Sequence, residues 1–173
     1  GSGITAEGRS VSIGDSDYFL CALNGEKGVR FLDPTSEKSG GGFVAVSVPV
    51  QAEGNTIGVL TGWLDKSLLR ELLSRNVSEG GVTVLCDDTG RILLDSAASG
   101  AMEGGNLFSI LQTAQGAGQD SLENMMQDIR EGNEGYAGYS LDGKQLLAAY
   151  VPLGYEGWVV CTSVPAEDMG FFA

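Results

Sequence analysis

The sequence contains no histidine. Ser/His/Asp and Cys/His nucleophile systems, imidazole metal sites and the usual general base near neutral pH all depend on this side chain. Its absence therefore excludes most common hydrolase chemistry. The three cysteines, Cys21, Cys86 and Cys161, show no CxxC spacing, so the sequence predicts neither a zinc site nor a dense disulfide framework. We expect no metal, no cofactor, and stability from ordinary packing.

Basic residues are scarce. Lys and Arg number 10 against 23 Asp and Glu, which gives a net charge of −13 over 173 residues. A chain with this balance has no basic surface to neutralise a phosphate backbone or to hold an anionic membrane. We therefore expect no nucleic-acid partner.

Long hydrophobic runs are missing too. Apolar runs such as those at 43–50 and 158–161 fall well short of the roughly 18 residues that a membrane span needs. Apolar residues nevertheless make up 42% of the chain. That share is enough for a packed core in one ordinary domain or in two small ones.

The first half of the chain predicts a helix, a hairpin and a second helix. Residues 15–23 can form a short helix capped by Asp15 or Ser16, with an apolar face of Phe19, Leu20 and Leu23. Valines at alternate positions over 43–50 predict a strand, and 56–64 predicts its hairpin partner. Asp65 is a good N-cap for a helix over 66–75, with an apolar stripe of Leu68, Leu69, Leu72 and Leu73.

The second half predicts two strands, then helices, then three strands. Strands at 82–86 and 91–94 flank turn residues at 87–90. Asn106 and Asp120 are each expected to cap a helix. Glycine turns separate the last strands, expected at 135–141, 144–151 and 157–164. This order is typical of an α+β fold with antiparallel sheets.

The chain carries an internal repeat. A shift of 103 positions without a gap superposes six identical residues between 45 and 65, where about one or two would match by chance. The matching pairs are Ala45 and Ala148, Val48 and Val151, Pro49 and Pro152, Glu53 and Glu156, Gly54 and Gly157, and Asp65 and Asp168. The repeat predicts a duplicated unit.

The order of these elements, present twice, resembles the PAS-like fold, and the local motifs resemble a double Cache domain. The motifs similar to the membrane-distal half are Asp17-Tyr18-Phe19, Val46-Ser47-Val48-Pro49-Val50 and Ile57-Gly58-Val59-Leu60. The motifs similar to the membrane-proximal half are Asp88-Thr89-Gly90-Arg91, Asn106-Leu107-Phe108, Tyr150-Val151-Pro152 and Gly157-Trp158. The resemblance covers nearly the whole chain.

The resemblance implies two tandem PAS-like units with antiparallel sheets flanked by helices, a membrane-distal unit over 1–76 and a membrane-proximal unit over 77–173. It also implies an extracytoplasmic sensor of a bacterial transmembrane receptor, such as a diguanylate cyclase, histidine kinase or chemoreceptor. Such a module binds a small organic ligand, and its parent protein is anchored in the cell membrane and dimeric. The repeat offset would place the opening strands of the first unit before residue 1. We therefore expect an N-terminally incomplete first unit with fewer strands than the second.

Seven residues of the first unit are candidates for ligand binding, because aromatic walls with a few polar groups suit small ligands. They are Tyr18, Phe19, Arg30, Phe31, Ser47, Thr61 and Trp63. Tyr18 can offer its hydroxyl while its ring stays packed. For each aromatic residue the alternative is core packing, and for Arg30 it is a solvated surface charge.

Two departures from the family pattern bear on the ligand. Ser16 stands where the family often has an arginine, and Trp63 stands where many amino-acid-sensing members have an aspartate. Without that guanidinium and that carboxylate, an amino-acid ligand loses its usual partners.

Other classes of function remain open. A structural or adhesive surface domain would need an exposed apolar or aromatic patch. An enzyme would need a paired general acid and base. Asp87 and Asp88 are adjacent and, if extended, point to opposite faces, so no such pair is visible. We therefore predict a protein that is not an enzyme.

The cysteines carry a prediction of their own. The first and fifth strands of a PAS-like sheet are antiparallel neighbours, which would bring Cys86 and Cys161 onto adjacent strands. We expect no disulfide between them, because few cross-strand registers give the Cβ separation that a bridge needs. Cys21 is expected to be an isolated buried thiol.

Overall fold

The computed structural model describes residues 2–12, 16–32, 42–75, 77–97, 99–114 and 119–169. Contacts within the chain define two compact units, Gly1–Leu68 and Leu69–Ala173. The division falls inside helix α2 (Lys66–Ser74). The boundary expected from the sequence, after residue 76, lies just beyond the end of this helix.

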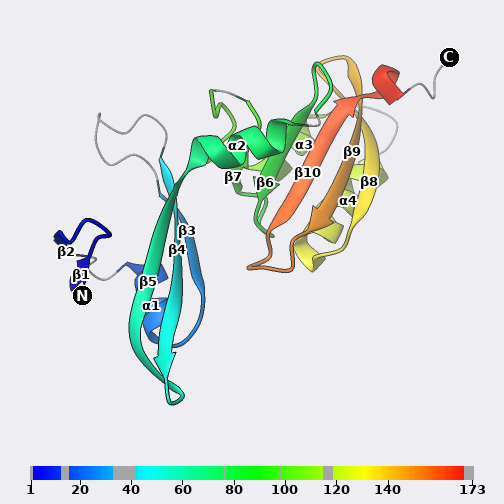
Figure 1. The fold of residues 1–173 in the computed structure, drawn as a ribbon. Helices are drawn as coiled ribbons and strands as arrows, with labels where there is room; N and C mark the ends of the chain where they lie inside the picture. The colour runs from blue at the N-terminus through cyan, green and yellow to red at the C-terminus, as the bar shows by residue number, and fades with distance from the viewer. Residues whose placement is uncertain are drawn as a thin grey trace. The chain divides into compact units, whose positions relative to one another are not determined.

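The first unit is built on a three-stranded antiparallel sheet in the order β3-β4-β5 (Figure 1). Its strands are β3 (Gly28–Leu32), β4 (Phe43–Ala52) and β5 (Asn55–Asp65). Helix α1 (Asp17–Leu23) lies against this sheet, and β1 (Ser2–Ile4) pairs with β2 (Ser10–Ser12) in a separate hairpin. The expected hairpin of the first half is confirmed as β4 and β5.

Local sequence explains how these elements begin and end. Glu53 and Gly54 both have positive φ, 50° and 78°, which is the geometry of a tight hairpin turn between twisted strands. The Asp65 carboxylate accepts the Ser67 N–H at 2.8 Å, so Asp65 caps α2 as expected.

The apolar faces expected for the two helices of this region are partly wrong. In α1 the buried residues are Tyr18 and Ala22, one turn apart, whereas Leu20 and Leu23 are 40% and 47% exposed. In α2, Leu68 and Leu72 are both 56% exposed, and the buried side chain is that of Lys66. Hydrophobicity alone therefore did not identify the covered side of either helix.

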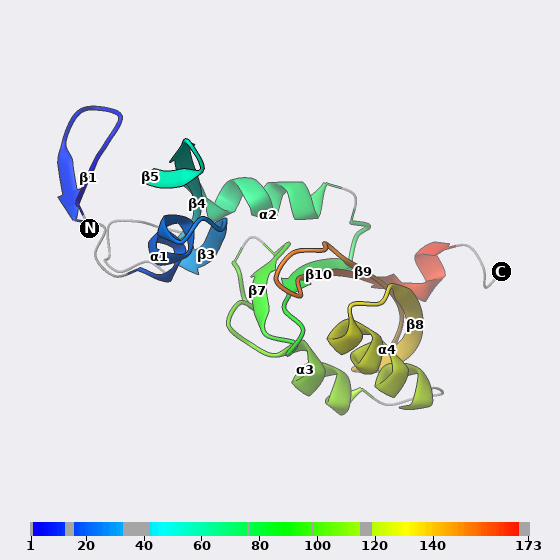
Figure 2. The same cartoon turned by 90° about the horizontal axis from the view of Figure 1, so that it is seen from below.

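The second unit is a five-stranded antiparallel sheet in the order β7-β6-β10-β9-β8. The strands are β6 (Val82–Cys86), β7 (Ile92–Asp95), β8 (Gly135–Leu141), β9 (Lys144–Pro152) and β10 (Val159–Pro165), and the 3-10 helix η1 (Ala166–Met169) follows. Figure 2 shows α3 (Leu107–Thr113) and α4 (Gln119–Glu131) on one side of this sheet. The expected order of strands and helices is confirmed.

The core of the second unit lies between the sheet and these two helices. Side chains of both helices pack on inward-facing residues of the strands. The helices contribute Phe108, Met125 and Ile129, and the strands contribute Ala148 and Cys161 among others. Asn106 caps α3 as expected, because its side chain accepts the Ser109 N–H at 3.1 Å. The cap expected at Asp120 is wrong, since α4 begins one residue earlier, at Gln119.

The internal repeat is visible in the strands but not in a shared register. Ala45 on β4 and Ala148 on β9 are both fully buried. A gapless repeat would pair Val151 with Ser163, because Val48 pairs with Leu60; the observed partner of Val151 is Val160, three residues earlier. The second hairpin is three residues shorter beyond this point, because six residues separate Pro152 from its partner Val159 and nine separate Pro49 from its partner Val59.

The expectation for Cys86 and Cys161 is confirmed. The two residues lie on the adjacent strands β6 and β10, both are buried, and both are free thiols. The expectation for Cys21 is only half met, because this free cysteine is partly exposed.

Within the described residues the first unit has fewer strands in its main sheet than the second, three against five, as expected. Strand β10 is central and pairs with β6 and β9, whereas β5 has β4 as its one partner among the residues that the structure describes. Eleven residues long, β5 contains no lysine or proline, and its one charged residue is Asp65 at its end. It lacks the features that usually protect an edge strand from further pairing.

Candidate functional site

The candidate site in the first unit begins with the close approach of α1 to β3. A Cβ atom placed on Gly28 would lie 2.5 Å from the Tyr18 carbonyl oxygen. Only glycine allows this contact, so α1 packs on the face of the sheet to which residue 28 belongs. Tyr18 is 8% exposed, and Phe19 beside it is partly buried.

Two hydroxyls meet on the same face of the sheet. Ser47 pairs with Gly28 on one side and with Thr61 on the other, and directly opposed residues share a face. The oxygens Ser47 Oγ and Thr61 Oγ1 lie 2.7 Å apart in a hydrogen bond, and Ser47 is fully buried. The structure thus brings together Tyr18, Ser47 and Thr61.

The next row of this face carries a cation and an indole. Arg30 and Trp63 both pair with Ala45, from opposite sides. Arg30 is partly buried and donates through Nη1 to the Val29 carbonyl at 2.9 Å. Trp63 is 51% exposed. Arg30 and Trp63 therefore belong to the same face as the hydroxyl pair.

Phe31 is separated from the other candidates. It follows Arg30 directly in β3, and successive side chains of a strand point to opposite faces. The Lys66 ammonium lies 5.8 Å from the centroid of the Phe31 ring, and Lys66 is only 2% exposed. Sequence reasoning missed Lys66, although a lysine in the first turn of a helix opposes the helix dipole and is an unusual choice there.

The α1 side of this sheet offers the groups that a small polar ligand needs. Ser47 and Thr61 supply neutral donors and acceptors, Arg30 supplies a planar cation, and Trp63 supplies an aromatic surface. No titratable pair suited to acid–base catalysis lies among these residues. The arrangement suits binding rather than bond cleavage.

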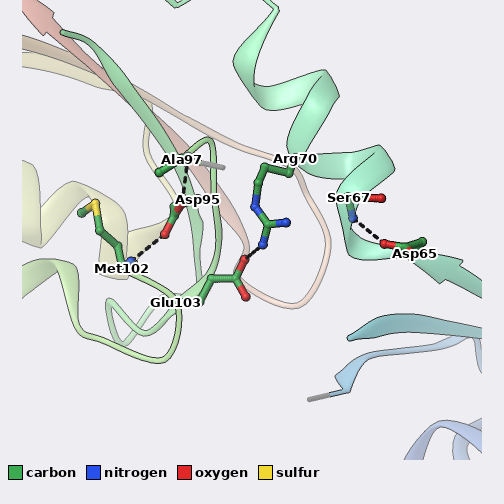
Figure 3. A network of polar contacts seen from close by, with 7 residues as sticks. All are labelled: Asp65, Ser67, Arg70, Asp95, Ala97, Met102 and Glu103. Atoms are coloured by element: carbon green, nitrogen blue, oxygen red, sulfur yellow. Dashed lines mark hydrogen bonds and ion pairs between the residues drawn. The ribbon is translucent and has the colours of Figure 1, made fainter. Parts of the chain in front are cut away.

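A second polar cluster lies in the second unit, around the loop after β7 (Figure 3). The fully buried Asp95 carboxylate accepts the N–H groups of Ala97 at 2.9 Å and Met102 at 2.6 Å. These bonds shape the loop that presents Glu103, which forms an ion pair with Arg70 of α2. Both side chains of the ion pair are largely buried, 15% and 18% exposed. The ion pair links α2 to the loop after β7.

Two tyrosine hydroxyls in the second unit are held in hydrogen bonds. Tyr139 donates to Ser163 Oγ at 2.8 Å and Tyr150 to the Asp128 carboxylate at 2.6 Å. Burial raises the pKa of both tyrosines, and Asp128 raises the pKa of Tyr150 further.

The two thiols of this core are equally inert. Burial raises the pKa of Cys86 to about 12, with neighbouring Cys161 adding to the shift, and burial raises the pKa of Cys161 to about 12. Thiols with such pKa values are not nucleophiles near neutral pH.

The structure also defines a cavity of about 1080 Å³ that sequence reasoning did not anticipate. It lies in the second unit, at the end of the sheet next to η1, and includes none of the seven candidate residues. The seven candidates therefore remain a prediction. One signal of the cavity was present in the sequence: Gly138 interrupts a strand, and an interior glycine often marks a close approach of a ligand or another backbone.

Two of the three comparisons with known proteins found nothing. No protein-family model matches the sequence. No curated protein matches it either.

Solved structures do match, and all those that we describe are sensory domains. The periplasmic sensory domain of the Campylobacter jejuni chemoreceptor Tlp1 superposes with a TM-score of 0.64 at 19% identity, covering 92% of this chain and 58% of that one. The extracellular domain assigned to the histidine kinase mmHK1S-Z2 gives 0.60 at 20%, with 90% and 57% covered. The ligand-binding domain of the Pseudomonas aeruginosa chemoreceptor PctB, solved with L-Arg, gives 0.61 at 14%, with 100% and 67% covered.

These matches show the fold. The chain has the α+β fold of extracellular and periplasmic sensory domains, in agreement with the Cache-like resemblance of the sequence. It spans little more than half the length of the solved sensory-domain chains of Tlp1 and mmHK1S-Z2.

Two observations apply to the residues that the structure describes. No helix in this part of the chain is long and apolar enough to cross a membrane. No group of three or more His, Cys, Asp or Glu side chains in the described ranges is placed to hold a metal ion.

Proposed function

We propose that the chain is the extracytoplasmic sensing module of a transmembrane receptor. It binds a small organic ligand and passes the bound state to an intracellular output domain. The observation that carries this proposal is the superposition on sensory domains of chemoreceptors and histidine kinases, with TM-scores from 0.60 to 0.64 over at least 90% of the chain.

The proposal extends to the parent protein and to the place of binding. The parent is membrane-anchored and dimeric, and the module faces outward from the cell membrane. The ligand lies on the α1 side of the first unit's sheet, against Tyr18, Arg30 and Trp63. The support is that this face combines a hydroxyl pair of which Ser47 is fully buried, a partly buried guanidinium and a half-exposed indole.

Isothermal titration calorimetry tests the proposal with a panel of amino acids, carboxylates, amines and purines. The protein must be folded and free of carried-over ligand. We expect one class of compound to bind, and Tyr18→Ala or Trp63→Ala to abolish that binding. Tyr136→Ala is the matched control, because Tyr136 is 80% exposed on β8 of the second unit. No binder in the panel, or unchanged affinity in both first-unit variants, would count against the proposal.

A structural or adhesive surface domain is the alternative, and one observation favours it. On β5, Ile57, Leu60 and Trp63 are 67%, 65% and 51% exposed, which gives the first unit apolar surface of the kind that binds other proteins. Light scattering at rising concentration separates the alternatives. A sensor that binds a panel compound as a monomer does not need this surface, whereas an adhesive domain associates without any ligand.

A further inference from the structure

The cavity of the second unit is formed by three segments that are distant in the sequence. In Figure 1 the loop leading into β6, the β8–β9 turn and η1 lie at the same end of the sheet. A Cβ atom on Gly80 would lie 3.4 Å from Pro165 Cγ, and Pro165 pairs with Leu146 of β9. The cavity therefore crosses the end of the sheet from the β6 side to the β8 side.

Glycine keeps this space empty. Gly138 of β8 lies directly opposite Leu147 and lines the cavity. A Cβ atom on Gly138 would meet no atom within 4 Å, and its backbone needs no positive φ. A larger residue would fit the strand and occupy part of the cavity, so the absence of a side chain at this position keeps that part open.

The cavity has apolar walls and opposite charges at its two sides. Leu147, Pro165 and Met169 supply apolar surface. Glu79 stands on the β6 side and Lys144 opens β9. Within the described part of the chain, neither the Glu79 carboxylate nor the Lys144 ammonium has an ion-pair or hydrogen-bond partner.

The sheet sets the separation of the backbone segments that carry Glu79 and Lys144. Strand β10 lies between β6 and β9, and neighbouring strands are about 4.8 Å apart, so the two sides are roughly 10 Å apart. Glu167 of η1 adds a second carboxylate to the lining.

We propose that this cavity binds an elongated zwitterion with an ammonium group at one end of an aliphatic chain and a carboxylate at the other. The ligand ammonium donates to Glu79, the ligand carboxylate accepts from Lys144, and the methylene chain lies on the apolar walls. This site is separate from the seven first-unit residues and does not rest on the function proposed for them.

Calorimetry with 8-aminooctanoate on the whole chain tests the proposal, because the charged groups of this probe are about as far apart as the two sides of the cavity. We expect saturable one-to-one binding. Octylamine and octanoate, each lacking one charged end, should bind about fivefold more weakly, which is the scale of one partly exposed ion pair. The shorter 4-aminobutyrate should also bind more weakly, because it cannot reach both sides.

Two glycine variants form a matched pair. Gly138→Leu should weaken binding, because the added side chain occupies part of the cavity. Gly62→Leu is the control, since Gly62 is likewise in a strand, with ordinary φ and no atom within 4 Å of its Cβ position, but lies in the first unit. It should bind the probe as the unaltered protein does. Lys144→Gln should weaken 8-aminooctanoate by about fivefold and leave octylamine unchanged.

Several results would overturn the proposal. The absence of saturable binding to the unaltered protein does so, and so does equal affinity in a Gly138→Leu variant with a normal unfolding transition. Equal affinity for octylamine and 8-aminooctanoate overturns the two-ended recognition. Loss of binding in Tyr18→Ala, with binding retained in Gly138→Leu, would assign the probe to the first unit, whose own function would then stand while this site falls.

Discussion

Ser47 and Thr61 face each other on β4 and β5, and their hydroxyl oxygens are 2.7 Å apart. Ser47 is fully buried, so this bond lies beneath the surface of the sheet face that α1 covers. Each hydroxyl keeps acceptor capacity beyond this bond. In the binding mode that we propose, a ligand would meet a polar surface that is already ordered, which lowers the entropy cost of binding.

Removal of one hydroxyl should destabilise the first unit. Ser47→Ala should lower the free energy of unfolding by about 1 kcal/mol, because the Thr61 hydroxyl loses its partner. Ser47→Ala with Thr61→Val should cost less than the two single changes together. Urea titration in a Trp158→Phe background isolates the first unit, since Trp63 is then the remaining tryptophan. Strict additivity of the two changes would contradict the bond.

Gly28→Ala should damage the contact between α1 and the sheet. The added Cβ would lie 2.5 Å from the Tyr18 carbonyl oxygen, which is backbone and cannot rotate away. We expect a loss of about 2 kcal/mol or more in the first unit, from strain in a packed contact. Gly62→Ala is the control and should be close to neutral, because nothing lies within 4 Å of its Cβ position. Trp63 fluorescence during urea titration measures the free energy of unfolding of each variant. Equal losses for Gly28→Ala and Gly62→Ala would contradict the packing of α1 on this sheet.

The ion pair of Arg70 and Glu103 should be costly to break from one side. Both side chains are mostly buried, and a buried charge without its partner destabilises by about 3 kcal/mol or somewhat less where water reaches it. Glu103→Gln should therefore lower the stability of the second unit, measured by Trp158 fluorescence in a Trp63→Phe background. Arg70→Met with Glu103→Leu should recover much of the loss. A neutral Glu103→Gln would mean that the pair is solvated.

Alkaline pH should unfold the second unit. The folded state raises the pKa of Cys86 from 9.0 to about 12 and the pKa of Cys161 to about 12. The folded state therefore holds protons that the unfolded state releases, so stability is full below pH 9 and falls from pH 9 towards 12. The loss should be on the order of 1 kcal/mol per pH unit for each thiol.

The control for this pH dependence is the variant with Cys86→Ala and Cys161→Ala. Its free energy of unfolding, measured in urea at several pH values above 8, should fall less steeply than that of the unaltered protein. Tyr139 and Tyr150 contribute in the same direction, because their pKa values are also raised, so some slope remains. Identical slopes in the two proteins would show that the thiols are not the groups responsible.

The strands β4 and β5 and those of the second unit were predictable because their signals are local, whereas β3 was not anticipated. Alternating valines identified β4, and Asp65 and Asn106 identified the starts of α2 and α3. Helix faces were less predictable. In α1, Leu20 and Leu23 are exposed while Tyr18 and Ala22 are buried, because the approach permitted by Gly28 decides which side of the helix is covered. That approach is a long-range contact, which helical periodicity does not contain.

The candidate ligand face was predictable as a set of residue types but not as a geometry. Five candidates, Tyr18, Arg30, Ser47, Thr61 and Trp63, lie on elements of the face that α1 covers, while alternation along β3 removes Phe31 from it. The cavity of the second unit depends on what is missing at Gly138 and on the meeting of three distant segments. Nothing in a single sequence records where such segments meet.

Among the residues that the structure describes, one side of β5 has no strand partner, and this bears on how the protein is handled. Ten of its eleven residues are uncharged, so neither charge nor proline stops two copies from joining along their backbones. Such joining is second order in protein concentration, so the yield on refolding should rise as the protein is diluted. A lysine in place of Leu60, whose side chain is 65% exposed, would act as a gatekeeper at little cost to the monomer.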